Sequence, residues 1–169
     1  MKKFELTAES KINIFGKKLF RIKALISFGD VEEGETGGWI EKEENLEQSS
    51  GDAWVYGNAE VYGNARVYGN ARVSGNAWVY GDAGVYGNAR VSGNAEVYGN
   101  ADYTTIHGFG TQFRTTTFFQ CEDKQIRVSC GCFLGTIPEF REQVKNTREG
   151  KIAEEYLMIA DLMEKHFVK

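Results

Sequence analysis

The sequence predicts a mainly β protein built around a triangular parallel β-helix, and the spacing and chemistry of one repeat carry this prediction. Residues 51–104 repeat the pattern Gly-Asp/Asn-Ala-x-Val-Tyr/Ser nine times without an insertion. Within Ala-x-Val, the alanine and the valine point to one face of a strand and the middle residue points to the other. Glycine followed by Asn or Asp supplies a corner, because both residues tolerate positive φ. Corners at every sixth residue close a three-sided coil of about 18 residues.

A coil of this length also predicts which outward-facing side chains stack above one another. The predicted rows are Trp54, Arg72 and Arg90; Glu60, Trp78 and Glu96; Arg66, Gly84 and Asp102; and, along one corner, Tyr62, Tyr80 and Tyr98. Two interpretations of these rows stay open. They are either solvated faces, or one of them is a subunit interface, because exposed rows of Trp and Tyr favour protein contact.

Residues 1–50 are expected to form an N-terminal strand cap and an acidic lead-in to the β-helix. Apolar, strand-like runs occupy residues 4–6 and 11–25, and Gly16-Lys17 offers a turn within the second run. Residues 30–47 then contain eight acidic residues and one lysine. Ile40 and Leu46 are six residues apart but out of register with Val55, so this segment predicts a loop or an irregular first coil. A β-helix needs such a cap, because its end exposes unpaired backbone.

Residues 105–169 predict a ββαα module that covers the other end of the β-helix. Residues 113–120 and 126–132 alternate like the two strands of a hairpin. Thr136 and Glu139 form a capping box that opens a first helix, and Gly150 can end that helix. Ile152, Tyr156, Ile159 and Met163 form the apolar stripe of a second helix.

The repeat resembles that of the hexapeptide-repeat, left-handed β-helix proteins. Their motif has an aliphatic residue with a small residue two positions before it, as Val and Ala stand here. Tyrosine directly after the valine departs from that family, which usually has a small residue there. The left-handed sense of the helix is what this resemblance implies.

The order of the segments resembles uncharacterised proteins of bacteria and their phages. The shared features are a Gly-Gly-aromatic-Ile-Glu box at residues 37–41, the Gly-Asn-Ala-x-Val-Tyr run, and the segments Arg114–Phe119 and Cys130–Phe133. The shared features lie between residues 37 and 133, and the resemblance implies an architecture and a phage connection. It implies no established activity.

Acyl transfer from coenzyme A thioesters is the alternative function that the hexapeptide resemblance implies. Such enzymes need a histidine base between neighbouring subunits and usually interrupt their coils with a loop. Here the nine units contain no histidine and no insertion, so His107, expected in a glycine-flanked turn, is the one candidate catalytic residue. Carbonic anhydrases on this type of helix use three histidines, and the chain has two.

The cysteines do not predict a metal site, and no cofactor is expected. Three cysteines have no fourth ligand at a usual zinc spacing. Cys130 and Cys132 share a strand face with Ile126 and Val128, which predicts buried free thiols.

Composition restricts the remaining function classes. The net charge of −4 does not predict general nucleic-acid binding. No apolar run approaches the roughly 18 residues of a membrane span, and no apolar segment follows the first charged residues. We therefore expect a cytoplasmic protein of a bacterium or a phage-infected bacterium.

The sequence as a whole predicts a non-catalytic, oligomeric binding protein, most simply a homotrimer. With the phage resemblance, we expect it to inhibit a bacterial defence system, either by binding a host protein or by sequestering a small anionic ligand such as a nucleotide signal. The candidate binding residues are Trp54, Arg72, Trp78, Arg90 and Arg114.

Overall fold

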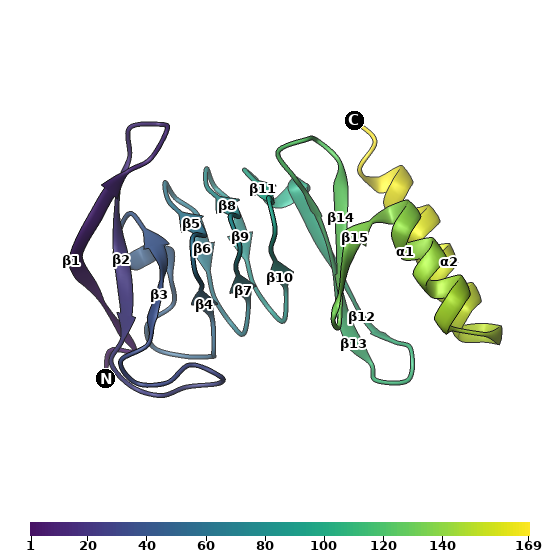
Figure 1. Cartoon of the computed structure of the whole chain (residues 1–169), viewed down its shortest axis with the longest axis horizontal. Coiled ribbons are helices and arrows are strands. Elements are labelled where there is room, and N and C mark those ends of the chain that lie inside the picture. Colours follow the sequence, from purple (N-terminus) through teal and green to yellow (C-terminus); the bar gives the residue numbers. More distant parts are fainter.

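The computed structural model describes all residues, 1–169, and arranges them in three parts along its long axis (Figure 1). An N-terminal sheet lies at one end, a stack of short parallel coils follows, and a second sheet backed by two helices lies at the other end. None of its helices has the length and apolar character needed to cross a membrane.

The repeat forms eight two-residue strands that pair in parallel with the coil above and below. They are β4 (Trp54–Val55), β5 (Glu60–Val61), β6 (Arg66–Val67), β7 (Arg72–Val73), β8 (Trp78–Val79), β9 (Gly84–Val85), β10 (Arg90–Val91) and β11 (Glu96–Val97). Partners are 18 residues apart, so that Val73 pairs with Val55 on one side and with Val91 on the other. The pairs define three parallel series, β4-β7-β10, β5-β8-β11 and β6-β9, which confirms the predicted β-solenoid.

The inward and outward positions follow the predicted alternation. Every alanine and valine of the eight strand-forming units is buried, with at most 2% of its surface exposed. The glycines that open these units, from Gly51 to Gly93, all have φ between +58° and +67°. A side chain is disfavoured in that conformation, which explains why glycine recurs at each of these corners.

The ninth repeat does not form a further parallel rung of the solenoid, and here the prediction was wrong; its last two residues begin the antiparallel strand β12 (Tyr103–Phe109) instead. Residues Asn100–Asp102 form a short 3₁₀ helix, η2, and Gly99 lacks the positive φ of the earlier corners. The Asp102 carboxylate accepts hydrogen bonds from the backbone N–H groups of Tyr98 and Gly99, at 3.0 and 2.9 Å. This local closure replaces the next rung, so the predicted row of Arg66 and Gly84 does not continue to a stacked Asp102.

The N-terminal sheet contains β1 (Phe4–Ile12), β2 (Lys18–Ala24) and β3 (Thr36–Ile40). β1 and β2 form a hairpin, β3 pairs with β2, and β3 also pairs in parallel with β5, so this sheet continues into the solenoid. The exposed end of the coils is thereby covered, as a solenoid requires.

The acidic segment contains an irregular first coil, one of the two predicted alternatives. Ile40 pairs with Val61, and Leu46 pairs with Val67, each 21 residues later. A 3₁₀ helix, η1 (Glu43–Asn45), lies between them, and its buried Asn45 donates to the carbonyl oxygens of Gly63 and Ala65. The three residues beyond the usual spacing explain why this segment is out of register with β4.

The C-terminal part has four antiparallel strands where the sequence predicted two. They are β12 (Tyr103–Phe109), β13 (Arg114–Gln120), β14 (Ile126–Cys130) and β15 (Phe133–Thr136), followed by α1 (Ile137–Thr147) and α2 (Gly150–His166). The capping box forms as predicted, with the Thr136 hydroxyl accepting from the Glu139 N–H. Gly150 begins α2 and does not itself end α1, which stops at Thr147.

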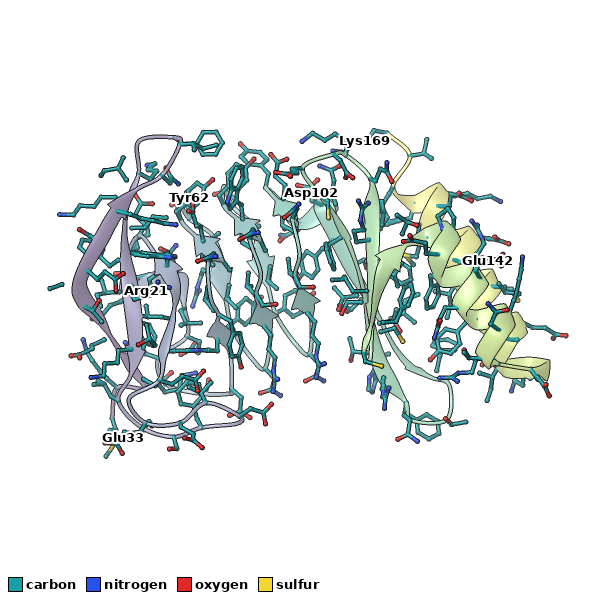
Figure 2. All side chains as sticks on the ribbon, viewed as in Figure 1. Arg21, Glu33, Tyr62, Asp102, Glu142 and Lys169 are labelled. Atoms are coloured by element: carbon teal, nitrogen blue, oxygen red, sulfur yellow. The ribbon has the colours of Figure 1, made fainter.

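This second sheet lies between the solenoid and the helices (Figure 1). Alternation along β13 places Phe119 in the solenoid core and Phe118 against Phe140 of α1. A backbone hydrogen bond from Glu122 to the carbonyl of Asn94 joins the β13–β14 turn to the last coil. Glu142 points away from the sheet on the outer side of α1 (Figure 2).

The three cysteines are free thiols with different environments. Cys121 is buried, Cys130 is half-buried and Cys132 is exposed. The predicted burial of Cys132 was wrong, because Gly131 and Cys132 form a two-residue turn between β14 and β15, where strand alternation ends.

Candidate functional site

A cavity of about 730 Å³ lies where the last coils meet the second sheet. It is lined by residues from β10 and the corner before it, from the β12–β13 hairpin, and from the β14–β15 turn. These residues are Asn88, Arg90, His107, Phe113, Arg114, Thr115, Gly131 and Cys132. We call it the junction pocket. Its volume is in the range of small-molecule sites in proteins.

Strand alternation explains why His107 and Thr115 lie in this pocket. Tyr103 at the start of β12 packs in the solenoid core, and Thr105 pairs with Thr117 of β13. Every second residue points to the same face, so His107 and Thr115 also face the solenoid side. The Thr117 hydroxyl accepts a hydrogen bond from the backbone N–H of Arg90 at 3.0 Å, which fixes β13 against β10.

His107 was expected in a turn, and that expectation was wrong. It lies within β12, and its Nδ1 is 3.2 Å from the Thr115 hydroxyl oxygen across the strand pair. Gly108 follows with φ +92° at the point where the pairing register shifts, so this glycine accommodates a bulge.

The charged side chains that line the junction pocket are both arginines. No aspartate or glutamate lines it, although the chain carries 24 of them and has a net charge of −4. Arg90 and Arg114 take part in none of the ion pairs of the molecule. Arg72, one coil before Arg90 in the same row, is instead paired with Asp30. The pocket therefore presents two uncompensated guanidinium groups, which suit an anion.

A ladder of amide side chains ends at this pocket. Asn70 donates from Nδ2 to the Oδ1 of Asn88, 18 residues later, and itself accepts from the backbone N–H of Asp52. Asn88 has no equivalent partner below it, because the chain has left the solenoid. Its Nδ2 group makes no hydrogen bond within the protein, and it adds a neutral donor to the two arginines.

The Arg114 side chain lies directly against the β14–β15 turn. A Cβ atom added to Gly131 would collide with Nη1 of Arg114, and Gly131 has φ +60°. Glycine at this position therefore both forms the turn and leaves room for the guanidinium group.

The hairpin loop that carries Phe113 is anchored to α2. The Tyr156 hydroxyl donates to the carbonyl oxygen of Phe109 at 3.2 Å. Burial raises the pKa of Tyr156, so the hydroxyl stays protonated as a donor at neutral pH. Phe113 itself is 65% exposed with φ +49°, an uncommon conformation for a bulky residue.

The structure separates the other predicted binding residues from this site. Trp54 was expected to be exposed but is fully buried, because the N-terminal cap brings Phe4 and Phe28 edge-on against its ring at 6.1 and 5.4 Å. Arg72 is held by Asp30. Trp78 is half-buried beneath Phe15 from the tip of the β1–β2 hairpin.

Three of the predicted residues do come together: Arg90, Arg114 and His107 all line the junction pocket. Sequence reasoning missed Asn88 and Phe113. The 18-residue spacing places Asn88 one coil after Asn70, but this row was not predicted, and the spacing does not show where such a row ends. Phe113 could not be found without knowing that residues 103–109 form a strand that pairs with β13.

A second surface feature is an aromatic corner formed by the predicted tyrosine row and the hairpin tip. Tyr62 and Tyr80 stack at 5.1 Å and Tyr80 contacts Tyr98 at 5.2 Å, which confirms the predicted ladder. Phe15 lies over Tyr62 and Tyr80, at 6.3 and 6.0 Å, and Figure 2 shows Tyr62 on the side of the coils that the hairpin reaches. The exposed fractions of Phe15, Tyr98 and the neighbouring Ile14 are 55%, 62% and 76%.

The side chains form no group of three or more His, Cys, Asp and Glu residues that could hold a metal ion. In comparison with known families, the chain matches the model of the YdcK beta solenoid repeat at residues 59–71, 65–81 and 83–99. The matched segments lie within the coils and do not include the second sheet. No curated protein matches the chain.

Proposed function

We propose that this chain is a non-catalytic binding protein that holds a small anionic ligand in the junction pocket. The observation that carries the proposal is the pair of arginines, Arg90 and Arg114, that share a cavity without a single carboxylate. An unpaired guanidinium group at a partly enclosed site is best satisfied by a phosphate or a carboxylate from outside the chain.

A binding role without chemistry is supported by the unbroken coils and by the surroundings of His107. The one side-chain partner of His107 is the Thr115 hydroxyl, and no carboxylate lines the pocket to orient or activate the imidazole. The alternative is acyl transfer from a coenzyme A thioester. It is favoured by one observation, that His107 is held in a strand and lines a cavity large enough for a substrate.

The cellular role that we infer is inhibition of a bacterial defence system by a phage-related protein in the cytoplasm. The resemblance to proteins of bacteria and their phages supports this role. Binding without turnover inhibits by sequestering an anionic signal, or by obstructing a host protein. We also infer that the solenoid is three-sided and left-handed, which its three series of parallel strands and its hexapeptide repeat support.

We further propose that the chain is a homotrimer whose contacts include the aromatic corner. Ile14, Phe15 and Tyr98 expose apolar surface in one region, and exposed aromatic clusters favour association. Light scattering at micromolar concentration is expected to give three times the 19.0 kDa mass of the chain. Replacing Phe15 with Ser should shift the particle towards monomer, and a wild-type protein that scatters as a monomer contradicts the proposal.

Isothermal titration calorimetry with inorganic pyrophosphate tests the anion site. We expect binding to the wild-type protein, and a loss of at least about tenfold in affinity for Arg114→Ala, since a charge-assisted pair contributes about 1.5–3 kcal/mol. Arg66→Ala is the matched control, because Arg66 is also an exposed arginine of the coils but does not line the pocket. Equal affinities for wild type and Arg114→Ala contradict the site.

The same preparation tests the alternative function. The binding proposal predicts that His107→Ala retains the ligand affinity within a few fold. It also predicts no release of free thiol from acetyl-coenzyme A. Stabilisation by coenzyme A together with thiol release that His107→Ala abolishes would establish the acyltransferase instead, because losing a general base costs about 10²–10⁴ in rate.

A further inference from the structure

We propose that the ligand of the junction pocket is a nucleotide, with its phosphates on Arg90 and Arg114 and its base stacked on Phe113. This inference rests on the proposed anion site and adds the chemical class of the ligand. Three independent features of the pocket carry it: its cations, its exposed aromatic ring and its volume.

The cations and donors define a site for more than one anionic oxygen. Arg90 comes from the coils and Arg114 from the start of β13, so the two guanidinium groups approach from different elements. The free Nδ2 of Asn88 is a third donor, on the solenoid side. A carboxylate offers two acceptor oxygens, fewer than the three donor groups, whereas a diphosphate offers more oxygens than there are donor groups.

Phe113 supplies the platform for a flat ring. Its side chain is 65% exposed although it lines the pocket, and it forms no aromatic pair or cation–π contact within the chain. Other exposed aromatic residues, such as Tyr68 and Tyr86, stack on each other. An unpartnered aromatic side chain next to arginines is a typical stacking surface for a nucleobase.

The conformation of the loop keeps this ring at the pocket. Phe113 has φ +49°, and its loop is tied to α2 through the hydrogen bond from Tyr156 to Phe109. A hydrophobic residue in this strained position is not explained by burial, because most of its surface is open to solvent. The cavity volume of about 730 Å³ accommodates a base, a sugar and two phosphates.

The test is calorimetry with two probes, adenosine diphosphate and inorganic pyrophosphate. We expect wild-type protein to bind adenosine diphosphate about fivefold to 150-fold tighter than pyrophosphate, which is the range that stacking of one base supplies. Phe113→Leu should abolish this difference and leave the affinity for pyrophosphate unchanged. Phe113→Trp should retain it, and Tyr86→Ala, which removes an exposed ring away from the pocket, should have no effect.

Each other outcome overturns a defined part of the reasoning. Equal affinities for adenosine diphosphate and pyrophosphate would show that the base does not contribute to binding, but would not contradict the anion site. No binding of either probe at millimolar concentration would overturn the site itself. A third outcome is that single-stranded oligonucleotides bind more tightly than adenosine diphosphate, with an affinity that rises with their length. In that case the ligand would be a nucleic-acid strand and not a nucleotide. Circular dichroism melting of each variant distinguishes lost binding from lost folding.

Discussion

Replacing Trp54 with Ala should strongly destabilise the fold, although Trp54 occupies the same outward-facing position of the repeat as Trp78. The Trp54 ring is fully buried between the coils and the cap, with edge-to-face contacts to Phe4 and Phe28. Truncating a buried Trp costs about 3–5 kcal/mol. Each aromatic contact contributes about 0.5–1.5 kcal/mol beyond its buried area, so we expect the upper half of that range, about 4–5 kcal/mol.

Trp78→Ala is the matched control for this prediction. Trp78 is half-buried and has one aromatic neighbour, Phe15, at 5.8 Å. We expect a loss of about 1–2 kcal/mol, because less surface is removed from water in the folded state. For a chain of this length, 1 kcal/mol corresponds to about 2–4 °C in Tm. Trp54→Ala should therefore lower Tm by about 8–20 °C and Trp78→Ala by about 2–8 °C, measured by circular dichroism. Equal shifts would refute the burial of Trp54 by the cap.

Three further predictions concern the core, the pH dependence and the pocket loop. Val73→Asp should cost several kcal/mol by burying an unpaired charge, whereas Arg72→Ala at the neighbouring outward position should change stability by about 1 kcal/mol or less in urea denaturation. The hydrogen bond from Lys124 lowers the pKa of Glu96. The ionised Glu96 carboxylate therefore stabilises the fold above its unfolded-state pKa, and this stabilisation is lost as the pH falls through the lower folded-state pKa. Glu96→Gln should accordingly show a smaller decrease in Tm between neutral and acidic pH than the wild type. Tyr156→Phe should lower Tm only slightly, consistent with about 1 kcal/mol for one hydrogen bond, but should weaken pyrophosphate binding because the pocket loop loses its anchor.

The sequence predicted the coils well because the glycine, alanine and valine of each unit each have a single geometric task. Glycine turns the corner, alanine and valine fill a narrow interior, and the spacing alone gives the register that pairs Val73 with Val55 and Val91. The same logic could not predict that the ninth unit fails. Its residues mostly match the repeat, but the Asp102 carboxylate accepts hydrogen bonds from two backbone N–H groups and stabilises a 3₁₀ turn in place of another rung.

The candidate site was harder to predict, because it depends on how the parts pack. Arg90 and Arg114 were identified as candidate anion contacts, but the sequence could not show that Arg72 has a carboxylate partner, Asp30, from the acidic segment 42 residues earlier. Nor could it show that His107 lies on a strand, because Gly108 and Gly110 make β12 resemble a turn. Trp54 was mistaken for an exposed residue because the repeat alone does not show where the cap covers it.

The position of the junction pocket follows from the way the solenoid ends. Along the coils, two corner side chains hydrogen-bond to their counterparts one turn away, Asn64 to Asp82 and Asn70 to Asn88. At the last coil this compensation stops, and the groups that would have paired with a next turn, Asn88 and Arg90, instead face a sheet of a different geometry. An antiparallel sheet cannot continue the 18-residue ladder of the parallel coils, so a cavity with unpaired donors lies at the junction. Arg114 adds a further cation where a carboxylate would have closed the site, and for this reason the junction is the place on the molecule where we expect an anionic ligand.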